Sequence, residues 1–164
     1  MRPGRERRTI FNQRAGPPHG KTLGIHDMQL TSVDKRTTID IRKANPRDPH
    51  SAYILRIEIQ PSVGNFIGEN ESVHFVKIAE FKSAFETFLR VREGSVTLDA
   101  TEDCRFEFFR WNAKGDVGLR YTIGKYIYEG EPPQPCPVTL SGRFKLHGEF
   151  VNQMAERLLE LLNA

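Results

Sequence analysis

Two segments of alternating apolar and polar residues, 104–111 and 116–123, limit the fold of this chain more than any other feature. Alternation with a period of two is typical of a strand with one buried face, and the Asn-Ala-Lys-Gly sequence at 112–115 favours a hairpin turn. With that turn, the apolar pairs on one face are Phe108 with Leu119, Phe106 with Tyr121, and Cys104 with Ile123. The pairs on the other face are Trp111 with Asp116, Phe109 with Gly118, Glu107 with Arg120, and Arg105 with Thr122. A slip by one residue would break every pair, so the sequence specifies this register.

The rest of the chain shows both strand and helix periodicity. Alternation predicts a half-buried strand at 53–59, and shorter alternating segments lie at 23–25, 39–41, 72–76, 96–98 and 138–146. Gly142 suggests a bulge in the last of these. Apolar residues recur at intervals of three and four over about 77–92 and 149–163, which predicts two amphipathic helices. We therefore expect an α+β fold, mainly an antiparallel sheet of about 6–8 strands with these two helices.

Glycine and proline mark the expected turns. Gly64 and Gly68 bracket Asn-Phe-Ile after the strand at 53–59, and we interpret this segment as a turn. The segment 129–137 contains four prolines, and we interpret it as an extended, stiff loop between two strands.

Positive charge is concentrated at the N-terminus. Residues 1–21 contain six Lys and Arg against one Glu, whereas the remaining residues contain 18 basic and 20 acidic side chains. We expect 1–20 to be a disordered basic arm and 21–164 to be a single α+β domain. A second hypothesis is that translation starts at Met28, so that 1–27 do not belong to the native protein. Because the domain itself is nearly neutral, nucleic acid is not its expected partner.

The sequence predicts a soluble, cytoplasmic protein. No apolar segment approaches the roughly 20 residues that cross a bilayer, and the basic N-terminus lacks the apolar region of a secretory signal. Two cysteines, Cys104 and Cys136, are too few for a disulfide framework, so we expect both thiols to be reduced. No membrane partner is expected.

The pattern of reactive side chains predicts no catalytic residue, no metal site and no cofactor. The five histidines are dispersed, and neither His-x-His nor Cys-x-x-Cys occurs. Cys104 falls on the core face of the hairpin, and Cys136 lies between two prolines without a cation or histidine that would activate it. The nucleophile motif Gly-x-Ser-x-Gly, the P-loop and the dinucleotide-binding glycine pattern do not occur either.

The hairpin places a mixed set of side chains on the face away from its apolar pairs. These candidate protein-binding residues are Arg105, Glu107, Phe109, Trp111 and Arg120. Trp, Phe and Arg are enriched at protein interfaces, and Trp and Arg often contribute the most binding energy. In the alternative interpretation a helix packs on this face, and Phe109 belongs to a second layer of core. The sequence leaves both interpretations open.

The order of elements resembles a known family. The strand 54–59 is followed by the Gly-bracketed Phe-Ile pair, the helix Ile-Ala-Glu-Phe-Lys-Ser-Ala-Phe-Glu-Thr-Phe-Leu at 78–89, the Gly-Ser-Val-Thr-Leu strand at 94–98, several antiparallel strands, and a helix ending Glu-Arg-Leu-Leu-Glu-Leu-Leu at 156–162. Over about residues 22–164 this order is similar to that of small bacterial immunity proteins of the WapI type and related uncharacterised families. The resemblance implies a cytoplasmic protein that binds and neutralises a cognate toxin domain and has no catalysis of its own. The Pro-rich segment and the basic arm depart from the family pattern, and no residue-level toxin contact carries over.

Three hypotheses about function therefore stand. The first is a protein-binding domain, with toxin immunity as its most specific form. The second is a small-ligand-binding or enzymatic domain, for which we expect a deep polar pocket with convergent carboxylates or histidines between sheet and helices. The third is a nucleic-acid-associated protein that uses the basic arm. Free sheet edges would also allow a dimer by edge pairing.

Overall fold

The structure, a computed structural model, describes residues 26–163. The predicted disordered arm at 1–20 and the strand expected at 23–25 lie outside these residues, so both stay predictions.

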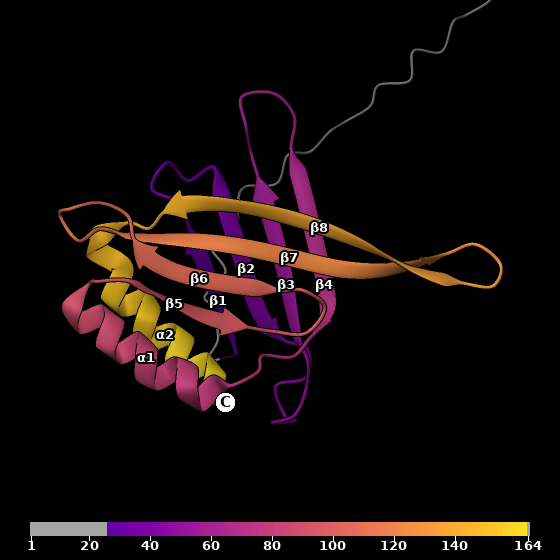
Figure 1. The fold of residues 1–164 in the computed structure, drawn as a ribbon, viewed down its shortest axis with the longest axis horizontal. Coiled ribbons are helices and arrows are strands. Elements are labelled where there is room, and N and C mark those ends of the chain that lie inside the picture. The colour runs from indigo at the N-terminus through magenta and orange to yellow at the C-terminus, as the bar shows by residue number, and fades with distance from the viewer. Residues whose placement is uncertain (1–25, 164) are drawn as a thin grey trace, which may run out of the picture.

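Eight strands, one short 3-10 helix and two α-helices make up the described chain. In chain order they are β1 (Asp27–Thr31), β2 (Thr37–Lys43), β3 (Tyr53–Ile59), β4 (Phe66–Val73), α1 (Ile78–Val91), β5 (Ser95–Asp99), β6 (Arg105–Arg110), β7 (Val117–Glu129), β8 (Gln134–Lys145), η1 (Gly148–Phe150) and α2 (Val151–Asn163). The strands form two four-stranded antiparallel sheets, β1-β2-β3-β4 and β5-β6-β7-β8 (Figure 1). The predicted α+β fold is confirmed, with two sheets where one was expected.

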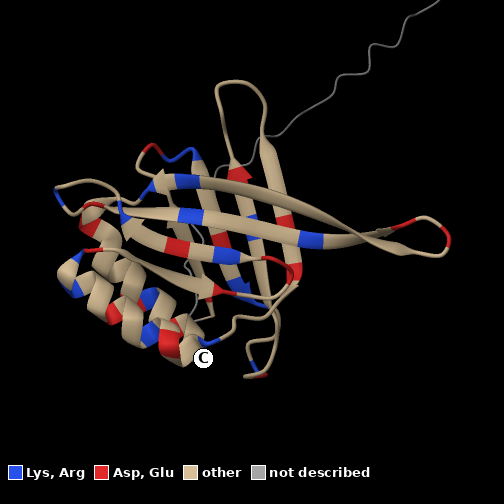
Figure 2. Ribbon diagram, in the orientation of Figure 1, with Lys and Arg blue, Asp and Glu red and all other residues tan. Residues whose placement is uncertain are grey.

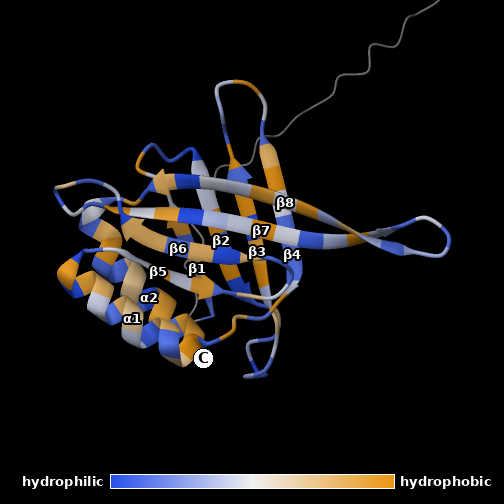
Figure 3. Ribbon diagram, in the orientation of Figure 1, coloured by the Kyte–Doolittle hydropathy of each residue, from blue (hydrophilic) through white to orange (hydrophobic). Residues whose placement is uncertain are grey.

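The two sheets lie in separate layers, and their strands cross at a steep angle (Figure 1). Within each sheet consecutive strands are neighbours, while α1 carries the chain from β4 in the first sheet to β5 in the second. Helix α1 packs beside β5, and α2 packs beside β1. Hydrophobic and hydrophilic residues alternate along the strands (Figure 3), and the apolar residues of sheets and helices join in one buried cluster.

Both helices bury one stripe of side chains because positions three and four apart lie on the same face of a helix. Helix α1 buries Phe81, Phe85 and Phe88, and the ring of Phe85 lies 4.7 Å from that of Phe108 on β6. The residues that α2 buries are Val151, Ala155, Leu158, Leu161 and Leu162. The predicted bounds of both helices agree with the structure to within two residues.

The hairpin of β6 and β7 has the predicted register. Phe108 opposes Leu119, Phe106 opposes Tyr121, and all four side chains are buried. On the other face Glu107 opposes Arg120, and Phe109 opposes Gly118. The Trp111 N–H donates to the Asp116 carbonyl at 2.7 Å and closes the turn.

We predicted a loop over the Pro-rich segment 129–137, but only residues 130–133 lie outside the strands. Strand β7 continues to Glu129, and β8 begins at Gln134 and includes Pro135 and Pro137. Strand β8 lies at the edge of its sheet, and these prolines oppose Tyr128 and Tyr126. Prolines two residues apart direct their nitrogens to the same side, here the open edge, so the missing N–H groups cost no ladder hydrogen bond. An edge strand therefore tolerates a sequence that a central strand would not.

Two glycine predictions are also wrong. Gly142 forms no bulge but pairs regularly with Tyr121, and a Cβ at this position would lie 2.3 Å from the Tyr121 hydroxyl oxygen. A glycine is needed here to make room for that ring. Gly68, expected at a turn, lies within β4 opposite Ile57, so the strand predicted at 72–76 begins earlier, at Phe66.

Candidate functional site

The outward face of the second sheet carries side chains in regular rows across its strands. The register places Thr97, Glu107, Arg120 and Arg143 in one row, on β5, β6, β7 and β8 respectively. The next row contains Ser95, Phe109, Gly118 and Lys145. Figure 2 shows basic positions on β6, β7 and β8, with an acidic position on β6 among them. Antiparallel sheets commonly leave one face to solvent, and this row pattern is typical of such a face.

Phe109 and Trp111 form an aromatic pair on this face. Their ring centroids lie 5.8 Å apart with the planes tilted by 35°. Both rings cover Gly118, where a Cβ would lie 2.6 Å from ring atoms of each. Phe109 is half-buried, while Trp111 is 39% exposed. Neither helix covers the pair. Trp111 is therefore not part of a second layer of core, whereas Phe109 is partly buried by its neighbours on the sheet.

Two guanidinium groups complete the cluster. The Arg120 guanidinium lies 5.2 Å from the centroid of the Phe109 ring, and that of Arg143 lies 6.0 Å from the Trp111 ring. A cation over an aromatic face is attracted by the ring quadrupole, with a gain of about 0.5–1 kcal/mol at exposed sites. We call Phe109, Trp111, Arg120 and Arg143 the aromatic–arginine patch.

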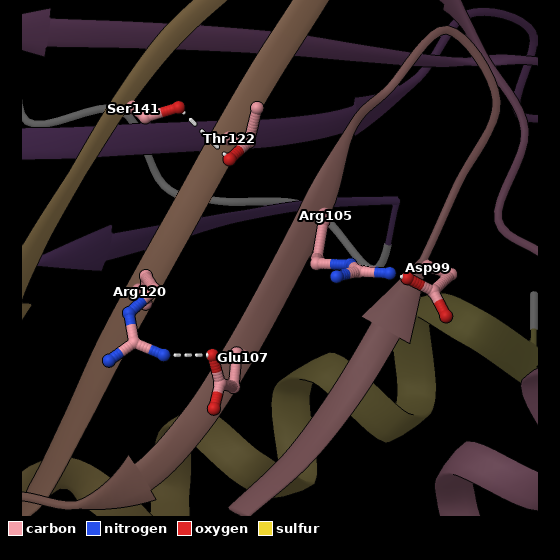
Figure 4. Close-up of polar contacts among 6 residues, drawn as sticks. All are labelled: Asp99, Arg105, Glu107, Arg120, Thr122 and Ser141. Carbon is pink, nitrogen blue, oxygen red and sulfur yellow. Dashed lines mark hydrogen bonds and ion pairs between the residues drawn. The ribbon is translucent and has the colours of Figure 1, made fainter.

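Two ion pairs lie in the row that contains Arg120 and in the row next to it (Figure 4). Arg120 donates to the Glu107 carboxylate, and Arg105 donates to Asp99 at 2.7 Å in the adjoining row. The hydroxyls of Thr122 and Ser141 lie 3.0 Å apart in that same row. These contacts connect outward side chains of neighbouring strands, from β5 to β6, from β6 to β7 and from β7 to β8.

Beside Trp111, an acidic residue is held by two donors. Asp116 is hydrogen-bonded by Lys145 at 2.5 Å and by the Asn112 amide at 2.8 Å. These two hydrogen bonds, in that order, hold the pKa of Asp116 below its ordinary value. Arg143 differs from Arg105, Arg120 and Lys145 on this face, because no carboxylate of residues 26–163 lies within ion-pair distance of it.

The structure brings together three of the five predicted binding residues and one that we did not predict. Phe109, Trp111 and Arg120 belong to the patch, while Glu107 and Arg105 flank it as ion-pair members. Arg143 was missed because its position depends on the pairing of β8 with β7. The alternation through 138–146 places Arg143 on the outward face, but the bulge that we predicted at Gly142 would interrupt this alternation just before Arg143.

Two partly open cavities bear on the ligand-binding hypothesis. One measures about 420 Å³, lies between β3 and the helices, and is lined by His50, His74 and Lys43 among others, without a carboxylate. The other measures about 260 Å³ and lies between β1 and α2. Its lining is mainly apolar and includes His147 and Lys35 but no carboxylate. Ligand pockets usually measure about 300–1,000 Å³ and hold convergent polar groups. The smaller cavity therefore gives the second hypothesis little support, whereas the larger one has the size of a ligand pocket but no carboxylate.

The remaining reactive groups stand apart from one another. Burial raises the pKa of the Cys104 thiol, which also exchanges hydrogen bonds at 3.4 Å with the N–H and carbonyl of Gly124. Cys136 is exposed on β8. Within residues 26–163, no group of three or more His, Cys, Asp and Glu side chains is placed to hold a metal ion. No helix in this range has both the length and the apolar character that crossing a membrane requires.

Neither a protein-family model, nor a curated protein, nor a solved structure matches this chain.

Proposed function

We propose that this chain is a non-enzymatic protein-binding domain that engages its partner through the aromatic–arginine patch. The observation that carries the proposal is the pairing of Arg120 with Arg143. They lie directly opposite each other on β7 and β8, beside an exposed Trp111 on a face that no helix covers.

The energetics of this arrangement favour a role in binding. Like charges directly opposite each other destabilise a sheet, typically by a few tenths to about 1 kcal/mol. Glu107 neutralises Arg120 from the β6 side, but Arg143 lies on an edge strand with no further strand to supply a carboxylate. Departures from a local rule of this kind are expected at functional sites.

The chemistry of the patch indicates the kind of partner. A carboxylate placed near Arg143 would gain a charge-assisted hydrogen bond, in bidentate geometry where the partner permits it. The rings of Phe109 and Trp111 would bury apolar area at the same time. The patch therefore suits a protein surface on which Asp or Glu lies beside an apolar side chain. Trp and Arg are the residue types from which the strongest interface contacts are built.

Toxin immunity is the most specific form of this proposal. It rests on the resemblance in element order to WapI-type immunity proteins, together with the exposed patch. The cognate partner would be the toxic C-terminal domain of a large secreted protein encoded beside the gene for this chain. An acidic surface on that domain would fit the patch.

Co-expression with that domain tests the proposal. The wild-type chain should restore growth, and Trp111→Ala and Arg143→Glu should each lose the rescue. Binding should also weaken as salt rises, because exposed charges are screened. Arg47→Glu is the matched control, since it makes the same charge change at an exposed residue far along the chain from the patch. Rescue that survives both patch substitutions would exclude this surface, and failure of the wild-type chain to rescue would exclude the immunity function.

A further inference from the structure

A second surface, distinct from the aromatic–arginine patch, lies where β7 and β8 run beyond β6. The last pair of β6 with β7 is Arg105 with Thr122, whereas β7 and β8 stay paired to Glu129 and Gln134. The two strands project from the body as a ribbon (Figure 1). Isolated two-stranded ribbons are at best marginally stable in water, so a long one is a candidate for stabilisation by another chain.

The ribbon exposes large apolar side chains. Tyr126 is 38% exposed, Ile127 37% and Tyr128 70%. Near its base, a groove of about 510 Å³ runs between the ribbon and β4, lined among others by Ile127, Phe66 and Ile67. Large apolar side chains are therefore exposed on both faces of the ribbon, and exposed apolar surface is a mark of interaction sites in soluble proteins.

Only one edge of the ribbon can accept another strand. The open edge of β8 contains Pro135 and Pro137, which supply no N–H there. On β7, the Gly124 N–H and carbonyl point away from β8, since they bond the Cys104 sulfur and the Asn70 amide. Tyr126 and Tyr128 direct their backbone groups to the same side as Gly124, because residues two apart in a strand share a direction.

No backbone hydrogen bond from residues 26–163 reaches these two tyrosines on that side. The backbone groups of Tyr126 and Tyr128 on the β7 edge are therefore unpaired among these residues, while the Tyr126 hydroxyl donates to the Asp103 carboxylate at 2.9 Å.

The sequence of this open edge is self-complementary. Residues 125–129 read Lys-Tyr-Ile-Tyr-Glu, with a cation at one end, an anion at the other and Ile127 at the centre. When two such strands pair antiparallel about Ile127, each Lys125 opposes a Glu129, and each Tyr126 opposes a Tyr128. A register centred one residue earlier would place Lys125 opposite Ile127 and lose both charge pairs.

We propose that two copies of this chain associate as a two-fold dimer through this edge of β7. Each Tyr126–Tyr128 pair exchanges two backbone hydrogen bonds, so the dimer gains four and the ribbons join into a sheet of order β8-β7-β7-β8. Ile127 lies at a position that makes no inter-chain hydrogen bond, where opposing side chains approach most closely. The second copy's Ile127 then lies beside the groove lined by Phe66 and Ile67. An isologous contact of this kind is the commonest basis of soluble dimers.

Charge reversal with sedimentation equilibrium tests this pairing in the full chain. The wild-type protein should show a monomer–dimer equilibrium. Lys125→Glu alone and Glu129→Lys alone each create two like-charge pairs by symmetry, so each should weaken the dimer by about tenfold or more. The double variant, Lys125→Glu with Glu129→Lys, restores opposite charges and should recover the wild-type dissociation constant. Glu131→Lys, the same charge change at the turn outside the paired segment, should leave it unchanged.

Cross-linking gives an independent readout of the register. In a Cys136→Ser background, Ile127→Cys should form an inter-chain disulfide on mild oxidation, because the two positions face each other with Cα atoms about 4.5 Å apart. Tyr128→Cys in that background should form no inter-chain disulfide, because each residue 128 lies opposite Tyr126 of the other copy. A wild-type monomer at every concentration, or no recovery in the double variant, would overturn the proposal. Trp111→Ala should leave the dimer intact, so failure of the patch and failure of the dimer are separable.

Discussion

Arg120 and Arg143 lie directly opposite each other on β7 and β8, although both side chains are cationic. Arg120 has a carboxylate neighbour in Glu107 on its other side, and its guanidinium lies over the ring of Phe109. Arg143 has the ring of Trp111 and no carboxylate among the described residues. The outward face of this sheet therefore carries a cation that no carboxylate of the described residues neutralises at ion-pair distance.

A pair of double-mutant cycles should reveal this asymmetry in the free energy of unfolding. Arg120→Gln with Arg143→Gln should give an unfavourable coupling of about 0.2–1 kcal/mol, and Arg120→Gln with Glu107→Gln a favourable coupling of similar size. Both couplings should shrink at high salt, because exposed charges are screened. Denaturant titration at two salt concentrations provides the measurement. Couplings of the same sign in both cycles would contradict the proposed role of Arg143.

Gly118→Ala should displace the rings of the patch. The added Cβ would lie 2.6 Å from atoms of both Phe109 and Trp111, and these partly exposed rings can move outward. We expect a loss of about 1 kcal/mol in unfolding free energy. Trp111 is the single tryptophan of the chain, so its fluorescence reports on the patch alone and should shift to longer wavelength.

Gly148→Ala is the control for that change, since a Cβ there meets nothing within 4 Å. Unchanged emission in Gly118→Ala would show that the rings do not rest on residue 118.

Asn70→Ala should loosen the connection between the two sheets. The buried Asn70 amide on β4 donates to the Gly124 carbonyl on β7 at 2.6 Å and to the Glu102 carboxylate at 2.8 Å. Its removal leaves the buried Gly124 carbonyl with only the weak donor of the Cys104 thiol and takes a donor from the Glu102 carboxylate, which costs about 1–3 kcal/mol. Chemical denaturation measures the loss, and Asn65→Ala, at an exposed position, should change stability little. Equal effects of the two substitutions would refute this role.

The two thiols should differ in reactivity and in their influence on pH dependence. Exposed Cys136 should react rapidly with a thiol reagent, and buried Cys104 only through transient opening. Burial raises the pKa of Cys104 above its ordinary 9.0, so the unfolded chain loses this proton first as pH rises. The stability present below pH 9.0 should therefore fall as pH climbs from there toward the raised native pKa.

Tyr53 and Tyr121, whose pKa values burial also raises, act in the same direction at higher pH. Unfolding free energies should be compared between wild type and Cys136→Ser, which should share the decline. Stability that rises above pH 9.0 would contradict this account.

The local elements were predictable because their determinants lie close together in the chain. The register of β6 and β7 follows from two short segments and the turn between them, and Phe106 and Phe108 face the core as predicted. Both helices follow from the spacing of their apolar residues. For the same reason Phe109, Trp111 and Arg120 could be assigned together to the outward face before the fold was known.

Tertiary structure decided what depends on neighbours distant in sequence. Pro135 and Pro137 can lie in β8 only because that strand is at an edge, and no local pattern states which strand is an edge. The partners of Arg143 depend on how β8 pairs with β7, and the exposure of Trp111 depends on where the helices pack. Local periodicity determines which side chains share a face. Only the packing of sheets and helices decided which face is buried, since burial depends on what covers it.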